Sequence, residues 1–178
     1  MNESAVERTG EAFELGEQLT VVGRKLAPGD AAPPFALESF DGSAMSTVSL
    51  ADSAGTVRLL NVVNSLDTPV CQIETNRWDK MRGELPPGVR VLTISMDLPF
   101  AQARWKAAEG VEHDALSAHK DEAFGRAYGV LIKEWRLLQR AVFVVGPDDR
   151  VTHAEYVADQ MLEPDYAAAA AAARAAAG

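Results

Sequence analysis

The segment Ser65–Cys71 (SLDTPVC) contains the residues best suited to chemistry, because it holds the only cysteine among 178 residues. The side chain of Thr68 suits the N-cap of a helix, and Pro69 suits the first helical position. Cys71 then lies in the first turn, where free backbone amides and the helix dipole favour negative charge. Since the thiolate is the nucleophilic form of cysteine, the segment predicts a reactive sulfur with Thr68 close by.

An inert, buried cysteine is the competing interpretation, because free cysteine is among the most buried residue types. A position at a strand-to-helix turn counts against it. On a helical wheel, Val70, Ile73, Trp78 and Met81 share an arc that we expect to face the core. Cys71 lies at the edge of that arc, so local physics leaves both interpretations open.

Cys71 and Arg77 are separated by five residues, the spacing of a cysteine-based phosphatase loop. Such a loop wraps backbone amides around a phosphate and needs permissive residues such as glycine. The stretch CQIETNR contains no glycine, and Glu74 would bring a carboxylate to the anion. In a helix that begins at Thr68, Arg77 is too far along to fold back, so we do not favour a phosphatase.

Apolar runs predict the strands that position this segment. Three runs rich in valine and leucine are typical of strands covered on both faces, and they are Val57–Val63, Val89–Ser95 and Ala141–Val145. After the turn signal GPDD, residues 151–157 predict an antiparallel edge strand. Residues 13–22 predict a hairpin that turns near Gly16, and residues 25–34 predict a connector.

Helical segments alternate with these strands. We expect helices over about residues 68–81, 99–109, 122–128 and 164–177, the last of them rich in alanine. This order predicts an α/β fold with a mixed central sheet and helices on both faces. The length suits one domain with a substantial core.

Composition excludes several function classes. The formal net charge of −9 argues against nucleic acid or an anionic membrane surface as a partner. No apolar run approaches the roughly 18 residues of a membrane span, and the N-terminus lacks the pattern of a secretory signal. One cysteine cannot form an internal disulfide, so we expect a cytoplasmic protein.

The histidines do not predict a metal site. His113, His119 and His153 are not paired at metal-ligand spacings, and no glycine-rich phosphate loop is present, so we expect no metal and no cofactor. His113, close to Glu109 and Glu112, is expected on a solvated helix surface.

The stretch NVVNSLDTPVC (residues 61–71) resembles the active-site segment of the thiol peroxidases, a branch of the peroxiredoxin family. The stretch DLPFAQARWKAAEG (residues 97–110) resembles the second signature segment of that branch. The stretches FGRAYGV, RAVFVV and EPDYA follow in the right order and spacing. The resemblance covers the chain from about residue 12, with residues 1–11 as an N-terminal extension and 12–178 as a single domain.

The resemblance implies a thioredoxin-like fold with an N-terminal β-hairpin, paired as a homodimer. It implies that Cys71 attacks a peroxide oxygen and becomes a sulfenic acid. It also implies that Thr68 and Arg140 hold the peroxide, with Arg136 as the fallback for Arg140. The activity expected is therefore the reduction of hydrogen peroxide and organic hydroperoxides.

Two positions depart from the family pattern. Asn64 stands where the family usually has a proline, and Lys106, expected to be a solvated helix residue, stands where most of the branch has a resolving cysteine. Because no second cysteine exists, the sulfenic acid must be reduced by an external thiol: thioredoxin, a glutaredoxin or a small thiol. The alternative is a redox sensor or relay that passes oxidation from Cys71 to a partner protein with little turnover.

Overall fold

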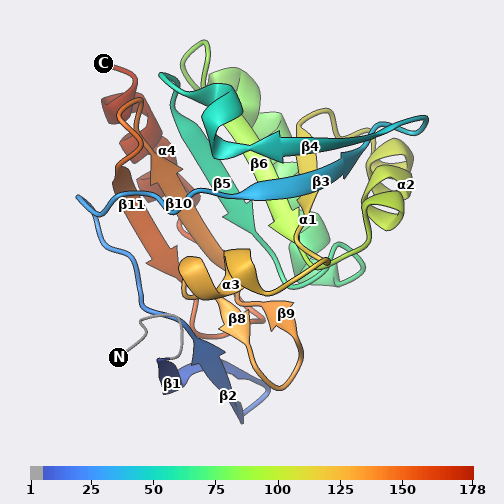
Figure 1. Ribbon diagram of the computed structural model, residues 1–178, viewed down its shortest axis with the longest axis vertical. Coiled ribbons are helices and arrows are strands. Elements are labelled where there is room, and N and C mark those ends of the chain that lie inside the picture. Colours follow the sequence, from blue (N-terminus) through green and yellow to red (C-terminus); the bar gives the residue numbers. More distant parts are fainter. Residues whose placement is uncertain (1–5) are drawn as a thin grey trace.

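A seven-stranded mixed sheet forms the centre of the structure, a computed structural model that describes residues 6–178 (Figure 1). Its strand order is β11-β10-β5-β6-β7-β3-β4. The strands are β3 (Ala36–Phe40), β4 (Met45–Ser49), β5 (Arg58–Val62), β6 (Arg90–Ser95), β7 (Asp114–Ser117), β10 (Ala141–Val145) and β11 (Val151–Tyr156). β5, β6 and β7 run parallel to one another, and the other pairings are antiparallel, so the predicted mixed sheet is confirmed.

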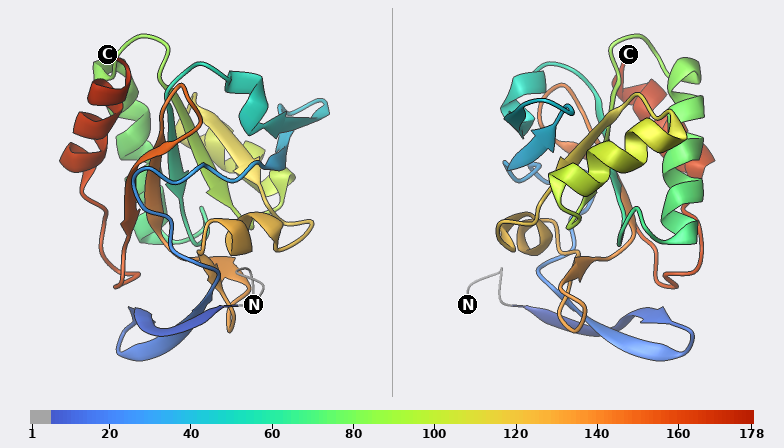
Figure 2. Two further views of the ribbon diagram at one scale, coloured as in Figure 1. Left: turned by 60° about the vertical axis from the view of Figure 1, so that its left-hand side comes forward. Right: turned by 90° about the vertical axis from the view of Figure 1, so that its right-hand side faces the viewer.

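Helices cover both faces of this sheet, as predicted. The helices are α1 (Pro69–Met81), α2 (Pro99–Glu109), α3 (Ala123–Ala127) and α4 (Tyr166–Ala176), with the 3-10 turns η2 (Leu50–Ser53) and η3 (Arg82–Glu84). Figure 2 shows α1 and α4 together on one side of the sheet. There Trp78 of α1 packs on Tyr166 of α4 with ring centroids 5.0 Å apart. Among residues 6–178, every helix is too short or too polar to cross a membrane.

The alternation of side chains along the central strands builds two core layers. Leu59 of β5 and Val142 of β10 join Trp78 and Tyr166 in the layer under α1 and α4. The neighbouring residues Leu60 and Phe143 point to the opposite layer, under α3 and the chain that precedes β3. The central strands are therefore buried on both faces, as their apolar runs predict.

A second sheet of four strands, ordered β1-β2-β8-β9, lies at one end of the molecule (Figure 1). Its strands are β1 (Glu7–Glu14), β2 (Glu17–Val22), β8 (Leu131–Ile132) and β9 (Leu137–Leu138). The hairpin turn near Gly16 is confirmed, but β1 begins at Glu7 rather than at Phe13. β1 therefore crosses the expected boundary at residue 12, and that division into an extension and a domain stays a prediction. Residues 1–5 of the extension lie outside the described residues.

The end of β1 reaches the segment that follows β11. The backbone N–H of Phe13 donates to the carbonyl of Ala158 at 2.9 Å, and the N–H of Gln160 donates to the carbonyl of Phe13 at 2.9 Å. These bonds bring Glu14 beside Gln160, although the two residues are far apart in the sequence.

His113 is buried, so its expected place on a solvated helix is wrong. It lies just before β7, where Nδ1 contacts Asp79 of α1 at 2.9 Å and Nε2 contacts Thr93 of β6 at 2.7 Å. The hydroxyl of Thr93 also accepts from the Asn61 amide at 3.0 Å. Gly110 ends α2 in the left-handed conformation, so the helical pairing expected for this histidine does not form. The network instead ties α1 to β6 and β5.

We predict that His113→Gln lowers the unfolding free energy by about 1–3 kcal/mol at pH 7, since it breaks two buried hydrogen bonds. Burial lowers the pKa of His113 from its ordinary value of 6.5, although Asp79 opposes that effect. The folded state therefore binds fewer protons than the unfolded state, and this stabilisation is lost as pH falls below about 6.5.

Urea unfolding from pH 7 to pH 5 measures this effect, with His153→Gln as the matched control outside the network. The gap between wild type and His113→Gln should narrow as pH falls. A gap that is constant across this range would contradict the assignment.

Candidate functional site

Cys71 lies at the third residue of α1 and is fully buried. It packs with Val63, Leu66, Trp105 and Val111 in a small apolar cluster. The burial of Cys71 is consistent with an inert thiol, whereas the polar groups close to its sulfur indicate a reactive one. Sγ lies 3.9 Å from Oδ1 of Asn64, and its charge interacts with that of the Arg140 guanidinium.

The start of α1 has the predicted form. Thr68 is the N-cap, with extended backbone angles, and Pro69 occupies the first turn. The Thr68 hydroxyl donates to the carbonyl of Ser65 at 2.9 Å and makes no capping bond to the helix. Its oxygen keeps lone pairs for a ligand, and the residue lines the cavity described below.

The buried face of α1 differs from the expected one. Ile73, predicted to face the core, is 55% exposed, whereas Cys71, Glu74, Thr75 and Trp78 are buried. The physical reason is that Glu74 and Thr75 have polar partners inside the protein. Hydropathy alone assigns polar residues to the surface, so the helical wheel predicts the wrong buried face.

Arg140 reaches the site because of strand register. Ala141 at the start of β10 pairs with Val62 at the end of β5, so Arg140 lies beside the chain that leaves β5 toward Cys71. Its side chain is 1% exposed. Nη1 donates to the Glu74 carboxyl, and Nη2 donates to the carbonyl of Gln160 at 2.9 Å and to Asn64 Oδ1 at 3.4 Å.

The charges of Arg140 and Glu74 depend on each other. Burial raises the pKa of Glu74 to about 8, although Arg140 pulls it down. Burial lowers the pKa of the Arg140 guanidinium, but its interactions with Glu74 and Cys71 have a larger, opposite effect. The pKa of Arg140 is therefore raised. Arg140 Nε and Glu74 Oε1 are buried without a hydrogen-bond partner among the described residues. Arg140 therefore retains one buried donor for a ligand.

The loop before Cys71 is anchored to the end of β6. Asp97 accepts from the Ser65 hydroxyl at 2.6 Å and from the Leu66 amide at 2.8 Å. The hydroxyl of Ser95 donates to the same carboxylate at 2.7 Å. The segment that leads to α1 is therefore fixed by the neighbouring parallel strand.

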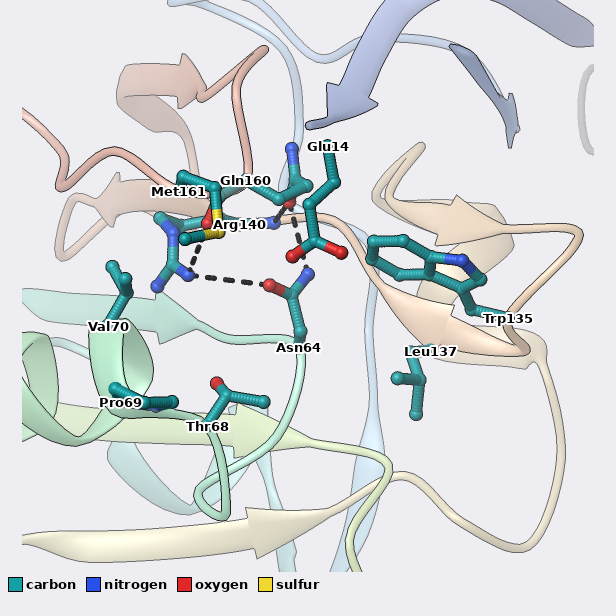
Figure 3. A pocket seen from close by; sticks show the side chains of 10 residues that line it. All are labelled: Glu14, Asn64, Thr68, Pro69, Val70, Trp135, Leu137, Arg140, Gln160 and Met161. Atoms are coloured by element: carbon teal, nitrogen blue, oxygen red, sulfur yellow. Dashed lines mark hydrogen bonds between the residues drawn. The ribbon is translucent and has the colours of Figure 1, made fainter. Parts of the chain in front are cut away.

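A cavity of about 330 Å³ opens beside these residues, and Figure 3 shows the side chains around it. Its lining is mainly apolar, with polar groups at a few points. The lining residues are Glu14, Asn64, Thr68, Pro69, Val70, Trp135, Leu137, Arg140, Gln160 and Met161. An apolar cavity with a few convergent polar groups is typical of a small-molecule site.

Other candidates lie elsewhere. Arg136, the fallback for Arg140, is 73% exposed and pairs with Glu122 at 2.9 Å. Arg77 lies on an unbroken α1 with its guanidinium 4.0 Å from the centroid of the Tyr166 ring, so the phosphatase loop does not form. Lys106 is half-buried rather than solvated, and burial lowers its pKa.

Sequence reasoning missed Glu74 and Gln160 as parts of the site. Glu74 carried one usable signal, because a residue three positions after Cys71 on a helix shares its face. Gln160 carried none, since it lies in an irregular segment between β11 and α4. Asn64 was recognised only as a departure from a family pattern, without the contacts that its amide makes.

Known proteins are similar to this chain over most of its length. A family model described as the AhpC/TSA family matches residues 28–154. A "Thiol peroxidase" of Halalkalibacterium halodurans is 48% identical over 162 residues, which cover 90% of this chain and 95% of that relative. A "Thiol peroxidase" of Bacillus subtilis is 43% identical over 152 residues, covering 85% and 89%.

Among solved structures, a peroxiredoxin-like protein from Aquifex aeolicus superimposes with a TM-score of 0.81 at 28% identity. The match covers 94% of this chain and 98% of that one. The expected thioredoxin-like architecture of the peroxiredoxins, with helices on both faces of a mixed sheet, is confirmed.

We predict that Glu74→Gln changes the pH dependence of stability. The raised pKa of Glu74 means that the folded state holds a proton that the unfolded state loses, between about pH 4.5 and about 8. Wild type therefore loses stability relative to Glu74→Gln as pH rises through that window. Urea unfolding at several pH values measures the difference, with the exposed Glu84→Gln as control, because the charge of Glu84 is not among the causes of the Glu74 shift. Parallel curves for wild type and Glu74→Gln would contradict the assignment.

Proposed function

This chain belongs to the AhpC/TSA family, and from this premise we propose that it is a thiol-dependent peroxidase with Cys71 as the peroxidatic nucleophile. Its substrates are hydrogen peroxide and organic hydroperoxides. The single observation that carries the proposal is the placement of a lone cysteine in the first turn of a helix, against a buried arginine that lines an apolar cavity.

In this mechanism the Cys71 thiolate attacks the terminal oxygen of the peroxide. An S–O bond forms, the O–O bond breaks, and the leaving alkoxide or hydroxide takes up a proton. The products are a sulfenic acid and an alcohol or water. We assign Thr68 and Arg140 to the peroxide, with Arg140 Nε as the donor because it has no protein acceptor among the described residues.

Thiolate formation alone does not explain a fast peroxidase. A lower pKa raises the thiolate fraction of a cysteine, but it also lowers the nucleophilicity of the sulfur and so removes much of the gain. The remaining acceleration must come from donors aimed at the charge that develops as the O–O bond breaks, each of which contributes about 3–4 kcal/mol. We assign this role to Arg140 and Thr68, because both side chains line the cavity.

The sulfenic acid is reduced by an external thiol, since the chain has one cysteine. Lys106 occupies the expected resolving position and cannot form a disulfide. The proposed reductants are thioredoxin, a glutaredoxin or a small thiol. We place the reaction in the cytoplasm, where such thiols are kept reduced.

We also propose that the protein is a homodimer. Leu98 and Phe100 at the start of α2 are 53% and 56% exposed, and an apolar surface of this kind favours association. Sedimentation at micromolar concentration should show the dimer, and a clean monomer would exclude it.

The redox relay, the second candidate, is not favoured, because the curated relatives named thiol peroxidases match nearly the whole chain. The number of catalytic cycles distinguishes a redox relay from a peroxidase. Repeated cycles with thioredoxin or a small thiol support the peroxidase, and a single oxidation followed by transfer to a partner protein would support the relay.

We predict that Arg140→Ala lowers the second-order rate of peroxide reduction by about 100-fold or more, because it removes a donor that faces the charge developing on the O–O bond. Peroxide consumption with thioredoxin and thioredoxin reductase measures the rate, and circular dichroism verifies folding. Arg136→Asn is the matched control, since it removes the neighbouring exposed arginine. Normal kinetics in Arg140→Ala would remove this residue from the mechanism.

A further inference from the structure

The orientation of the Asn64 amide is fixed by its neighbours. The Leu138 carbonyl can only accept, and it lies 2.6 Å from Nδ2. Oε1 of Gln160 lies 3.1 Å from the same nitrogen, and it is an acceptor because it also receives the backbone N–H of Arg140 at 2.8 Å. Oδ1 of Asn64 therefore faces Cys71 and Arg140, with no ambiguity between oxygen and nitrogen.

The Gln160 amide is fixed in the same way. Its Nε2 donates to the carbonyl of Val157 at 2.7 Å and to that of Ala158 at 3.1 Å. Both Asn64 and Gln160 are buried, so water does not compete strongly for these groups. The acceptor that faces Cys71 is thus held by a chain of bonds that begins at the backbone.

The separation of 3.9 Å between Sγ of Cys71 and Oδ1 of Asn64 is long for a direct S–H···O contact. An S–O bond followed at an angle by an O–H···O hydrogen bond of about 2.7 Å spans a separation of this size. Oδ1 is therefore in place to accept a proton from a sulfenic acid on Cys71.

Such an acceptor matters because the sulfenic acid has no resolving cysteine. It persists until an external thiol arrives, and a second peroxide can oxidise it first. In that step the sulfur of the deprotonated sulfenate attacks ROOH. A second S–O bond forms, the O–O bond breaks, and the products are the sulfinate and ROH. The positive charge of Arg140 beside the sulfur favours the deprotonated sulfenate. A hydrogen-bond acceptor for the sulfenic proton would oppose this effect, because it stabilises the protonated form.

We propose, building on the peroxidase function above, that Asn64 is a further catalytic residue that keeps the Cys71 sulfenic acid protonated through an O–H···Oδ1 hydrogen bond and so slows over-oxidation. Gln160 is the positioning residue that holds the Asn64 amide. The pair protects a site that lacks the usual second cysteine.

Sequential mixing of reduced protein with hydrogen peroxide tests the proposal. One equivalent forms the sulfenic acid, and an excess without thiol then drives the second step. Intact mass distinguishes one added oxygen from two. In Asn64→Leu the second oxidation should be about fivefold faster than in wild type, the factor that corresponds to one typical net hydrogen bond. The first oxidation should not be faster, because Asn64 also contacts Arg140.

Two further variants separate this role from a structural one. Asn64→Asp keeps an acceptor of the same shape, so its second oxidation should be no faster than in wild type, although its charge slows the first. Leu137→Ala widens the cavity, and simple opening would raise both rates together. Only loss of the acceptor raises the second rate alone.

A second oxidation in Asn64→Leu that is unchanged or slower than in wild type would overturn the proposal, and so would acceleration in Asn64→Asp. If Asn64→Leu does not fold, Gln160→Met and Asn64→Asp test the proposal instead. Gln160→Met releases the Asn64 amide, so it must accelerate the second oxidation, and an unchanged rate would overturn the proposal. Wild type that forms no sulfenic acid at all would instead overturn the peroxidase function itself.

Discussion

The buried contact between Arg140 and Glu74 joins the two elements on which the site is built. Glu74 belongs to the helix that carries Cys71, and Arg140 precedes the strand that pairs with β5. Both side chains are almost fully buried, and removing one partner of such a pair leaves the other uncompensated. The pair therefore fixes the position of α1 relative to the sheet while it holds a positive charge beside the sulfur.

Polar groups that are buried on this scale need partners, and the site is arranged to supply them. Asn64 and Gln160 satisfy the guanidinium and the backbone around it, and Asp97 fixes the loop that leads to α1. Within residues 6–178, Nε of Arg140, the residue assigned to the peroxide, is a buried donor without an acceptor. A site of this kind is preorganised, so little reorganisation is needed when charge develops in the reaction.

The sequence predicted the parts of the fold that depend on strong local patterns. The apolar runs of β5, β6 and β10 and the start of α1 at Thr68 were all correct, because burial and capping leave a clear local signal. The resemblance added Arg140, which the register of β10 on β5 brings beside Cys71. The strands β7, β8 and β9 are too short to show an alternation of apolar and polar residues in the sequence. The burial of Glu74, His113 and Gln160 depends on distant partners, which no local pattern contains.

The most direct test of the central claim is stopped-flow oxidation of the reduced protein by limiting hydrogen peroxide, followed by tryptophan fluorescence and by intact mass. Trp105 packs with Cys71 in one cluster and should report the change at the sulfur. We expect oxidation far faster than that of a free thiol, with a single oxygen added at Cys71 and the reaction lost in Cys71→Ser. Oxidation no faster than that of an ordinary thiol would contradict the claim and would leave Cys71 a buried core residue on a peroxiredoxin fold.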